Sequence, residues 1–421
     1  MRPHLLIFEP DPRGHSCEWI EHLLAAAPKS PEQPILSLVV AADLAHLLGD
    51  AVARAPANQV RVVALTSREQ ALCTHHRLAV SAFARWWLMR RYLQRTGASA
   101  GMFLQFDHLS LPLGLGLRTG RPVSGVLFRP SVHYGAFGPG RPSAKERLRD
   151  GRKEVLYRLM LANPSLRAVL SLDPYFPEFA WRRYRYGEKV LALPDPAFPA
   201  PAGVSAREPA FMAGIPKERA LFVLFGELTA RKGVLPLIEA LAMLPADAAG
   251  RIAVIVAGRL DAALRPTVQQ AAAKLALARR DLWFHLEDRR LGADELAQLV
   301  SRSDVILAPY QRFVGSSGIL MWAARTQRPV ICQDYGLLGH LTRRHALGLT
   351  VDTTDAGALS GAIALAAQRG PAALGDAAGM AAFAASHTVE NFALTLLRGA
   401  LRDPAHATAH SLSPAPRTAP K

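Results

Sequence analysis

One lysine and one small polar cluster occupy places where α/β proteins bind phosphate. Lys232 follows the apolar run 221–225 and a glycine, and Gly315-Ser316-Ser317-Gly318 precedes the apolar segment 319–324. An ammonium group neutralises phosphate charge, and a helix N-terminus offers backbone N–H groups and the positive end of its dipole. The pattern predicts a phosphate site made by Lys232, Gly315, Ser316, Ser317 and Gly318. A solvated lysine and ordinary serine capping of a helix are the alternatives.

The elements that must position these residues are short apolar strands alternating with helical segments. Between residues 221 and 350, strands are expected at 221–225, 252–257, 305–307 and 330–331, each ending near a glycine, a proline or a small polar residue. Such alternation predicts a parallel α/β domain whose ligand lies at the carboxyl ends of the strands.

The first 190 residues show a similar alternation. Apolar strands are expected at 4–8, 35–41, 60–65, 102–106, 123–128 and 168–172, with helical segments between them. This arrangement predicts a second parallel α/β domain. Three polar residues, Asp107, Arg129 and His133, follow strands on the same predicted side of that sheet, and Gly14 lies in the first strand-to-helix turn. Each could bind substrate hydroxyls or serve only the loop that contains it.

The order of motifs in the second half resembles a known family. Lys232-Gly233, Gly258, Asp304 with Pro309, the 315–318 cluster and 329–331 occur in the order found in the nucleotide-sugar half of GT-B glycosyltransferases of the group 1, retaining type. The resemblance covers residues 210–370 well and reaches the first half more loosely, through residues 9–15 and 193–196. It implies two Rossmann-like domains facing across a cleft, and a nucleotide sugar as co-substrate without a separate cofactor.

The resemblance also assigns roles to single residues. Lys232 falls where the family places its diphosphate lysine, whereas Glu227 stands where relatives have an arginine, a role that Arg231 could take over. His285 lies in the segment where relatives hold the nucleotide base by backbone contacts. Gly14 is counted with the donor-binding residues, and Asp107, Arg129 and His133 are the catalytic, acceptor-side candidates. No Asp-x-Asp pair is present, so a metal-independent site is expected.

The largest departure from the family concerns a pair of glutamates eight positions apart that touch the donor. Aligning residues 328–331 with the family pattern puts Val314 at the first of these positions and Trp322 at the second. Neither side chain can bond to a sugar or ribose hydroxyl as a carboxylate does. Either the donor is read through other groups, such as Ser316, Ser317 or Gln311, or activity has been lost.

Domain boundaries follow from the composition. We expect an acceptor-binding domain at 1–193, a linker rich in Pro, Ala and Gly at 194–216, and a nucleotide-sugar-binding domain at 217–385. A final helix at 386–402 should cross back to the first domain, as in relatives, and a disordered tail is expected at 403–421.

Composition limits the setting of the protein. The chain has 421 residues, a formal net charge of +16 and three cysteines without pairing or metal spacing. Scattered thiols, the lack of a signal peptide and the lack of a span of ~20 apolar residues predict a cytoplasmic protein. The segment 75–96 combines aromatic residues with five arginines, which predicts peripheral contact with the inner, anionic face of a membrane; a buried aromatic core with a solvated basic face is the alternative.

Three functions compete. The leading hypothesis is a retaining, metal-independent glycosyltransferase, expected to be a hexosyltransferase, that acts on a glycan or lipid-linked acceptor in polysaccharide biosynthesis. The second is a catalytically degenerate GT-B protein that binds a nucleotide or a partner, and the third is a sugar-nucleotide epimerase. An epimerase should carry several carboxylates and histidines near the diphosphate site, and few surround Gly315. The basic residues follow no nucleic-acid-binding module.

Overall fold

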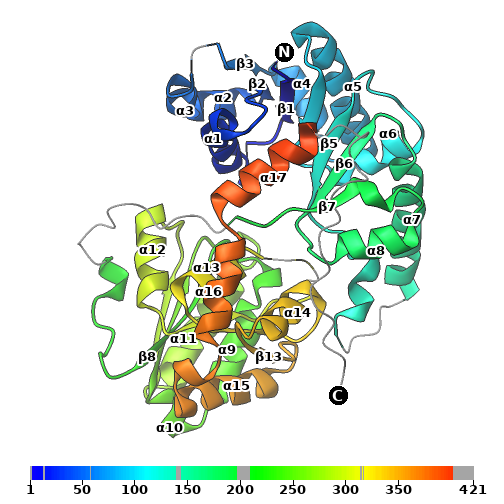
Figure 1. Ribbon diagram of the computed structural model, residues 1–421. Helices are drawn as coiled ribbons and strands as arrows, with labels where there is room; N and C mark the ends of the chain where they lie inside the picture. The colour runs from blue at the N-terminus through cyan, green and yellow to red at the C-terminus, as the bar shows by residue number, and fades with distance from the viewer. Residues whose placement is uncertain are drawn as a thin grey trace. The chain divides into compact units, whose positions relative to one another are not determined.

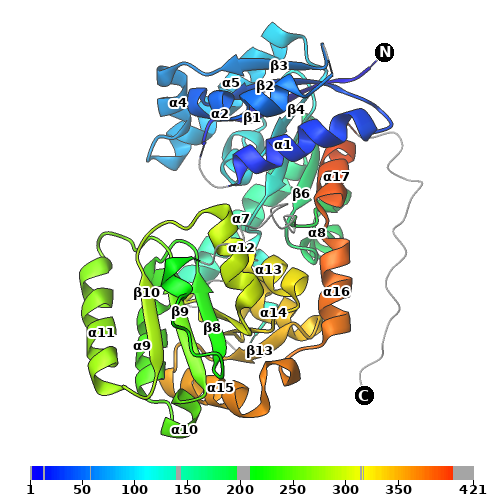
Figure 2. The same cartoon turned by 90° about the vertical axis from the view of Figure 1, so that its left-hand side faces the viewer.

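The structure, a computed structural model, describes residues 2–12, 15–56, 58–138, 144–196, 209–312, 315 and 317–401. These residues form two compact units, each built on one parallel sheet (Figures 1 and 2). The predicted class, two Rossmann-like parallel α/β domains, is confirmed. Gly14, Val314, Ser316, residues 197–208 of the predicted linker and the predicted tail 403–421 lie outside the described residues.

The compact units are discontinuous in sequence. Unit 1 comprises Met1–Pro130, Arg149–Leu193 and Phe392–Lys421, and unit 2 comprises Ser131–Leu148 and Pro194–Asn391. The sequence instead suggested one continuous first domain over 1–193. The difference lies in residues 131–148, which group with unit 2 although the chain on both sides of them belongs to unit 1.

Unit 1 is built on a seven-stranded sheet with the order β3-β2-β1-β4-β5-β6-β7. All its strand pairs are parallel. The inner strands are buried on both faces and read as apolar runs, as expected when helices cover both sides of a sheet. The strands are β1 (His4–Glu9), β2 (Ile35–Val40), β3 (Val60–Ala64), β4 (Ala100–Phe103), β5 (Val123–Leu127), β6 (Leu166–Ser171) and β7 (Val190–Ala192).

Helices cover both faces of this sheet. Helices α1 and α17 lie on one face, where Trp19 and Phe392 pack with ring centroids 4.8 Å apart, and α5 lies on the other (Figures 1 and 2). The helices are α1 (Ser16–Ala26), η1 (Ala27–Lys29), α2 (Ala42–Leu47), α3 (Gly49–Ala53), α4 (Ser67–Cys73), α5 (Leu78–Thr96), η2 (Asp107–Leu109), α6 (Ser110–Gly114), α7 (Ala144–Leu161), α8 (Phe176–Arg183), η4 (Gly187–Lys189) and α17 (Val389–Leu401).

Unit 2 is built on a six-stranded parallel sheet with the order β10-β9-β8-β11-β12-β13. Asp304 joins two of its strands, because its Oδ2 accepts a hydrogen bond of 2.8 Å from the Leu221 N–H. The strands are β8 (Ala220–Phe225), β9 (Ile252–Ala257), β10 (Trp283–Glu287), β11 (Val305–Ala308), β12 (Val330–Gln333) and β13 (Gly348–Val351).

The core of unit 2 is an apolar layer between the sheet and helices α9, α10, α11 and α15. Phe222, Val254 and Ile363 are among its fully buried members. The helices are η3 (Ser131–Ala136), η5 (Ala210–Met212), η6 (Ala230–Lys232), α9 (Val234–Ala242), α10 (Ala246–Ala249), α11 (Arg265–Ala278), α12 (Ala293–Arg302), α13 (Ile319–Thr326), α14 (Gly336–Arg344), α15 (Ala356–Arg369), η7 (Pro371–Ala373) and α16 (Ala377–Ser386).

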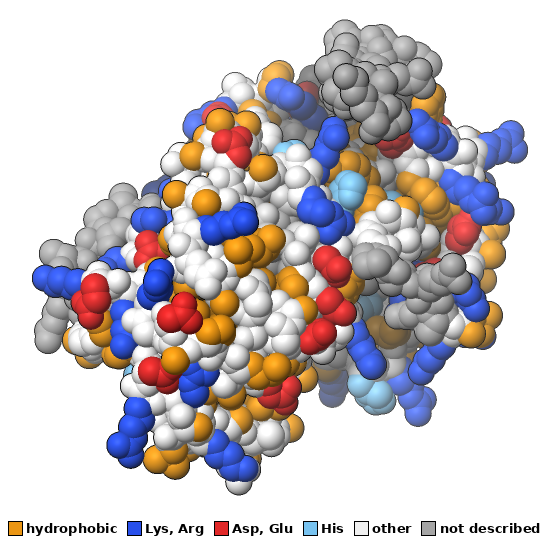
Figure 3. Space-filling view, turned by 90° about the horizontal axis from the view of Figure 1, so that it is seen from below, with side chains coloured by type: hydrophobic (Ala, Val, Ile, Leu, Met, Phe, Trp, Pro, Cys, Tyr) orange, Lys and Arg blue, Asp and Glu red, His pale blue; other side chains and the backbone are white. Residues whose placement is uncertain are grey.

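Charge is dispersed on the face drawn in Figure 3. Lys and Arg side chains are scattered over it, and Asp and Glu side chains lie among them. This face therefore carries no single basic stripe. Within the described parts of the chain, no helix combines the length and the apolar character needed to cross a bilayer.

Candidate functional site

The first predicted cluster lies at the carboxyl-terminal edge of the unit 2 sheet. Strand β8 ends at Phe225, and the following loop leads through η6 to Gly233. Gly233 has φ +72°, and a Cβ at this position would lie 1.9 Å from the carbonyl oxygen of Pro309. Only glycine fits this close approach. The loop after β8 therefore packs directly on the residues that follow β11.

Lys232 is half-buried at this contact. Its Nζ donates a hydrogen bond to Tyr310 Oη at 2.5 Å and lies 3.5 Å from the carbonyl oxygen of Phe225. The guanidinium of Arg231 lies 5.5 Å from the centroid of the same tyrosine ring. Among the described residues, no carboxylate forms an ion pair with Lys232. Lys232 therefore keeps a positive charge that an anion can neutralise.

The serine cluster meets this lysine through Tyr310. Ser317 Oγ lies 3.2 Å from Tyr310 Oη and 3.5 Å from the Ile319 N–H, and Gly318 is the N-cap of α13. Gly315, two residues before Ser317 in the chain, is also buried. Lys232 and Ser317, which follow different strands, are thus brought together at one helix N-terminus.

The remaining predicted donor residues lie apart from this cluster. Glu227 is exposed and forms an ion pair of 3.0 Å with Arg259, also exposed. His285 lies on β10, where its Nε2 is 2.9 Å from Glu287 Oε2 and its ring stacks on Phe211. No hydrogen bond or ion pair between described residues joins Glu227 or His285 to Lys232.

Trp322, at the second glutamate position of the family pattern, is a half-buried residue of α13. Its ring meets that of Phe225 nearly at right angles, with centroids 6.3 Å apart. An indole packed on the end of β8 therefore stands where relatives present a carboxylate.

A second site is a cavity of about 410 Å³ within unit 1. It lies at the carboxyl ends of β4 and β5 and the start of α1. Asp107 holds two of these loops together, since its carboxylate accepts hydrogen bonds from the Phe128 N–H at 3.0 Å and the Arg129 N–H at 3.3 Å. The lining residues are His15, Ser16, Trp19, Leu104, Gln105, Asp107, His108, Phe128 and Arg129.

Two titratable groups of this cavity are shifted by their surroundings. Desolvation raises the pKa of Asp107, and the two backbone N–H groups oppose this shift. Desolvation and the nearby Arg85 cation lower the pKa of His108. At pH 7 His108 is therefore a neutral imidazole that can donate one hydrogen bond and accept another.

His133, the third acceptor-side candidate, belongs to the other compact unit. It lies in η3, buried, with its ring 5.0 Å from that of Tyr134 and 5.1 Å from that of Phe137. It is not among the residues that line the cavity of Asp107 and Arg129. A strand-end position alone suggested that the three would lie together, but the chain passes from unit 1 to unit 2 after Pro130.

Sequence reasoning missed Tyr310 at the first site and His108, Gln105 and Trp19 at the second. Tyr310 and His108 were detectable, because each lies in the loop that follows a buried strand, at the edge where α/β proteins bind ligands. Trp19 could not be distinguished from an ordinary core residue of an amphipathic helix. Within the described residues, no group of three His, Cys, Asp or Glu side chains is arranged to hold a metal ion.

Comparison with known protein families identifies the domain that contains the carboxyl-terminal edge of the unit 2 sheet. Residues 219–368, which contain Lys232, Tyr310 and Ser317, match the family model described as "Glycosyl transferases group 1". The chain carries a group 1 glycosyl transferase domain. No curated protein matches it in sequence.

Solved structures resemble this glycosyltransferase over almost the whole chain. Sucrose-phosphate synthase from Thermosynechococcus elongatus has a TM-score of 0.66 at 16% identity, covering 94% of this chain and 98% of that one. The trehalose-phosphate synthase of Burkholderia vietnamiensis gives 0.64 at 16% identity, with coverages of 94% and 96%. Anabaena HepE in complex with UDP gives 0.61 at 13% identity, with coverages of 94% and 98%. At these identities the likeness establishes the GT-B fold.

Proposed function

We propose that this glycosyltransferase transfers a hexosyl group from a nucleotide diphosphate donor to a glycan or lipid-linked acceptor, with retention of configuration. The proposal rests mainly on one observation: Lys232 and Ser317 converge at the carboxyl edge of the unit 2 sheet, within the matched family region. The UDP complex of a protein with the same fold supports a nucleoside diphosphate as the ligand.

The proposed reaction breaks the bond between the anomeric carbon and the diphosphate oxygen and forms a bond from that carbon to an acceptor hydroxyl oxygen. Lys232, Arg231 and the N-terminal end of α13 stabilise the negative charge on the departing diphosphate. The diphosphate oxygen takes the proton of the acceptor, so the acceptor side needs no strong base. In this mechanism the cationic side chains take the role that a metal ion has elsewhere, and the nucleotide sugar is the only co-substrate.

For the acceptor we propose the unit 1 cavity. Its polar lining, with Asp107, His108, Gln105 and Arg129, offers both donors and acceptors of hydrogen bonds, as the hydroxyls of a sugar require. Phe128 adds an apolar surface, and its ring stacks on that of Trp19 at 5.4 Å.

A second candidate function is nucleotide binding without transfer. It is favoured by Trp322, which is packed against Phe225 where relatives use a carboxylate on the donor. A panel of UDP- and GDP-sugars separates the two candidates, with nucleotide release measured in the presence and absence of acceptor extracts. Acceptor-dependent release supports transfer. Binding without release by any donor supports the second function and contradicts the first.

We also propose that the protein contacts anionic membrane surfaces through the outer face of α5. Trp87 is 48% exposed, and the guanidinium of Arg91 lies 5.4 Å from the centroid of its ring. Arg90 and Arg95 are exposed on the same helix. Arg85, in contrast, is buried and donates to the Cys73 carbonyl oxygen at 3.1 Å, so it does not belong to this face. Interfacial tryptophans and arginines favour an anionic leaflet.

Liposome flotation tests this contact. Neutralising Arg90 and Arg95 with glutamine should weaken binding to anionic vesicles at low salt, since each cation contributes about 1 kcal/mol near such a surface, whereas the charge of Arg91 is matched by Glu69 at 3.0 Å. The matched control replaces Arg280 and Arg290, exposed arginines of unit 2, and should float like the wild type. A wild-type protein that stays soluble with anionic vesicles would favour a soluble acceptor.

A further inference from the structure

Tyr310 is fully buried, yet its hydroxyl lies at the centre of the charged edge of unit 2. The hydroxyl contacts Lys232 Nζ at 2.5 Å and Ser317 Oγ at 3.2 Å. The two partners come from different loops, and Lys232 lies 78 positions from Tyr310 in the sequence. A single phenol therefore links the lysine and the serine of the proposed diphosphate site.

The main chain of Tyr310 is held firmly. Its carbonyl oxygen accepts hydrogen bonds from Thr353 Oγ1 at 2.8 Å and from Tyr335 Oη at 3.2 Å. Tyr335 Oη in turn accepts a bond of 2.7 Å from the Arg312 N–H. The backbone on both sides is tied as well, because the Gln311 N–H donates to the Arg231 carbonyl oxygen at 2.8 Å. The hydroxyl is thus a fixed point to which flexible side chains are attached.

The hydrogen bonds around the Tyr310 hydroxyl run in one direction, from Lys232 towards Ser317. A lysine ammonium has only N–H groups to donate, so Tyr310 Oη is the acceptor in their contact. A phenol oxygen that accepts from a cation becomes a stronger donor, and Ser317 Oγ lies within reach of its proton. Ser317 then keeps its own hydroxyl proton for an incoming oxygen atom. The chain Lys232–Tyr310–Ser317 ends in a donor.

We propose that Tyr310 is the positioning residue of the diphosphate subsite. It holds the Lys232 ammonium and the Ser317 hydroxyl in the geometry in which both donate to one diphosphate group. The inference rests on the proposed function, because it assigns the diphosphate of the donor to this edge. Its ligand class is any diphosphate, with or without a nucleoside attached.

Calorimetry with inorganic pyrophosphate and with UDP tests the proposal, since pyrophosphate reports the subsite without contributions from a base or ribose. Tyr310→Phe keeps the ring and removes only the hydroxyl. We expect it to weaken the binding of both ligands about five- to tenfold while thermal unfolding stays near that of the wild type. Tyr184→Phe is the matched control: Tyr184 is a buried tyrosine of unit 1 whose hydroxyl has no hydrogen-bond partner among the described residues.

A double-mutant cycle distinguishes positioning from packing. If Tyr310 acts through Lys232, Tyr310→Phe should cost almost nothing once Lys232→Ala is present, whereas independent effects would add. Ser317→Ala should be non-additive with Tyr310→Phe in the same way, and it provides a second variant should Tyr310→Phe fold poorly.

The outcomes separate the inference from the proposed function. A wild-type protein that binds neither pyrophosphate nor UDP nor GDP overturns both. Wild-type binding that Lys232→Ala weakens, but that neither Tyr310→Phe nor Ser317→Ala changes, overturns the role of Tyr310 alone. Additive effects of Tyr310→Phe and Lys232→Ala also overturn it.

Discussion

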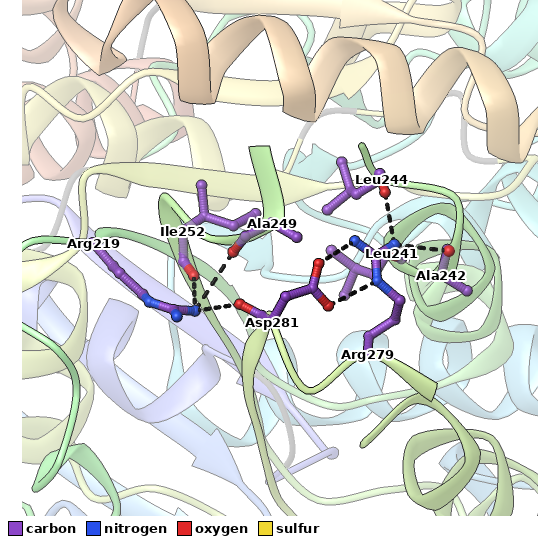
Figure 4. A network of polar contacts seen from close by, with 8 residues as sticks. All are labelled: Arg219, Leu241, Ala242, Leu244, Ala249, Ile252, Arg279 and Asp281. Carbon is purple, nitrogen blue, oxygen red and sulfur yellow. Dashed lines mark hydrogen bonds and ion pairs between the residues drawn. The ribbon is translucent and has the colours of Figure 1, made fainter. Parts of the chain in front are cut away.

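The two edges of the unit 2 sheet both contain cations, but they use them differently. At the amino-terminal edge, before β8 and β10, Arg219 and Arg279 bind backbone carbonyl groups and share Asp281 as a partner (Figure 4). At the carboxyl-terminal edge, Lys232 and Arg231 lie against the neutral ring of Tyr310. At the first edge the charge of Arg279 is matched by the Asp281 carboxylate, whereas at the second no carboxylate among the described residues forms an ion pair with Lys232.

The contacts of Arg279 show how its charge and its N–H groups are used. Arg279 donates to both carboxylate oxygens of Asp281, at 3.0 and 2.8 Å, and its Nη1 reaches the carbonyl oxygens of Leu241, Ala242 and Leu244 at 3.3, 2.9 and 2.7 Å. These carbonyls lie at or just beyond the end of α9, where helices lack internal partners. Arg279 thus serves the fold, with its charge matched by Asp281.

The comparison gives a criterion for deciding whether a cation is structural or functional. A guanidinium whose N–H groups are used by carbonyls and whose charge is matched by a carboxylate stabilises the fold. A cation held by a neutral hydroxyl, at the edge where parallel sheets bind ligands, is available to an anion. Replacing Arg279 should therefore lower the free energy of unfolding, whereas replacing Lys232 should lower the affinity for diphosphates.

The largest effect is expected for Arg279→Ala. The substitution removes the ion pair with Asp281 and the hydrogen bonds that Arg279 donates to three carbonyl groups, so the free energy of unfolding should fall by about 4 kcal/mol. Urea denaturation measures it, with Arg280→Ala, its exposed neighbour, as control. Pyrophosphate affinity of the folded variant should not change. A loss of stability as small as that of the control would show that the amino-terminal edge is not a structural clamp.

The second-largest effect concerns unit 1, where the carboxylate of Glu9 lies at the end of strand β1. Glu9 is fully buried at the end of β1, and desolvation raises its pKa from 4.5 to about 7 against the opposing effects of Arg85 and the Asp11 N–H. The folded protein binds the proton of the Glu9 carboxyl more tightly than the unfolded chain does. Below pH 4.5 this carboxyl is protonated in both states, so its burial as an ion lowers the stability of the fold little there. Its cost grows as the pH rises towards 7 and is complete above that.

The resulting pH dependence is testable by urea denaturation at pH 5 and pH 8. Between these pH values ionisation of Glu9 should lower the free energy of unfolding of the wild type by on the order of 3 kcal/mol, since one pKa unit corresponds to about 1.4 kcal/mol. Glu9→Gln should lack this part of the slope and gain stability relative to the wild type at pH 8. Parallel pH profiles of the two proteins would contradict the assignment.

At the carboxyl-terminal edge, Lys232→Ala should weaken UDP and GDP binding by about 2 kcal/mol, roughly thirtyfold, through loss of a charge-assisted contact. Its free energy of unfolding should change little, because Lys232 is matched with no carboxylate among the described residues. Calorimetry without added metal, repeated with EDTA, measures the affinity. Unchanged binding in a folded variant would remove Lys232 from the diphosphate site.

The smallest effect concerns Glu227, which the family pattern would make an arginine. Its ion pair with Arg259 is exposed, and such pairs contribute at most about 1 kcal/mol. Glu227→Arg should leave stability nearly unchanged and tighten UDP binding a few-fold at low salt, with the gain fading as salt is added. Tightening that persists in high salt would indicate a direct contact instead of a field effect.

Much of the fold was predictable, because buried parallel strands are continuous apolar runs with clear ends. Residues 35–41 and 123–128 were expected as strands and are found as β2 and β5, each one residue shorter. The two-domain α/β class followed from the same signal. The grouping of residues 131–148 with unit 2 did not, since it depends on packing partners such as His340, on which Phe137 stacks.

The site was predictable where one loop defines it and not where distant loops meet. Lys232, Gly315, Ser317 and Gly318 were identified from local motifs, and their role in binding stays a prediction. Tyr310 was missed, because its contact with Lys232 depends on the pairing of β8 beside β11. The clamp around Arg279 was missed for the same reason: its carbonyl partners lie 35 to 38 positions earlier in the sequence.

The last helix has a consequence for how the protein is made. Helix α17 completes unit 1: Phe392 packs on Trp19, the Arg167 guanidinium donates to the Ala400 carbonyl oxygen, and a Cβ on Gly399 would lie 2.8 Å from Leu170. A ribosome has therefore translated all of unit 2 before the segment that covers the first sheet emerges. Until then Trp19 and Leu170 lack their final partners, so the amino-terminal unit, first to be synthesised, is the last to finish folding.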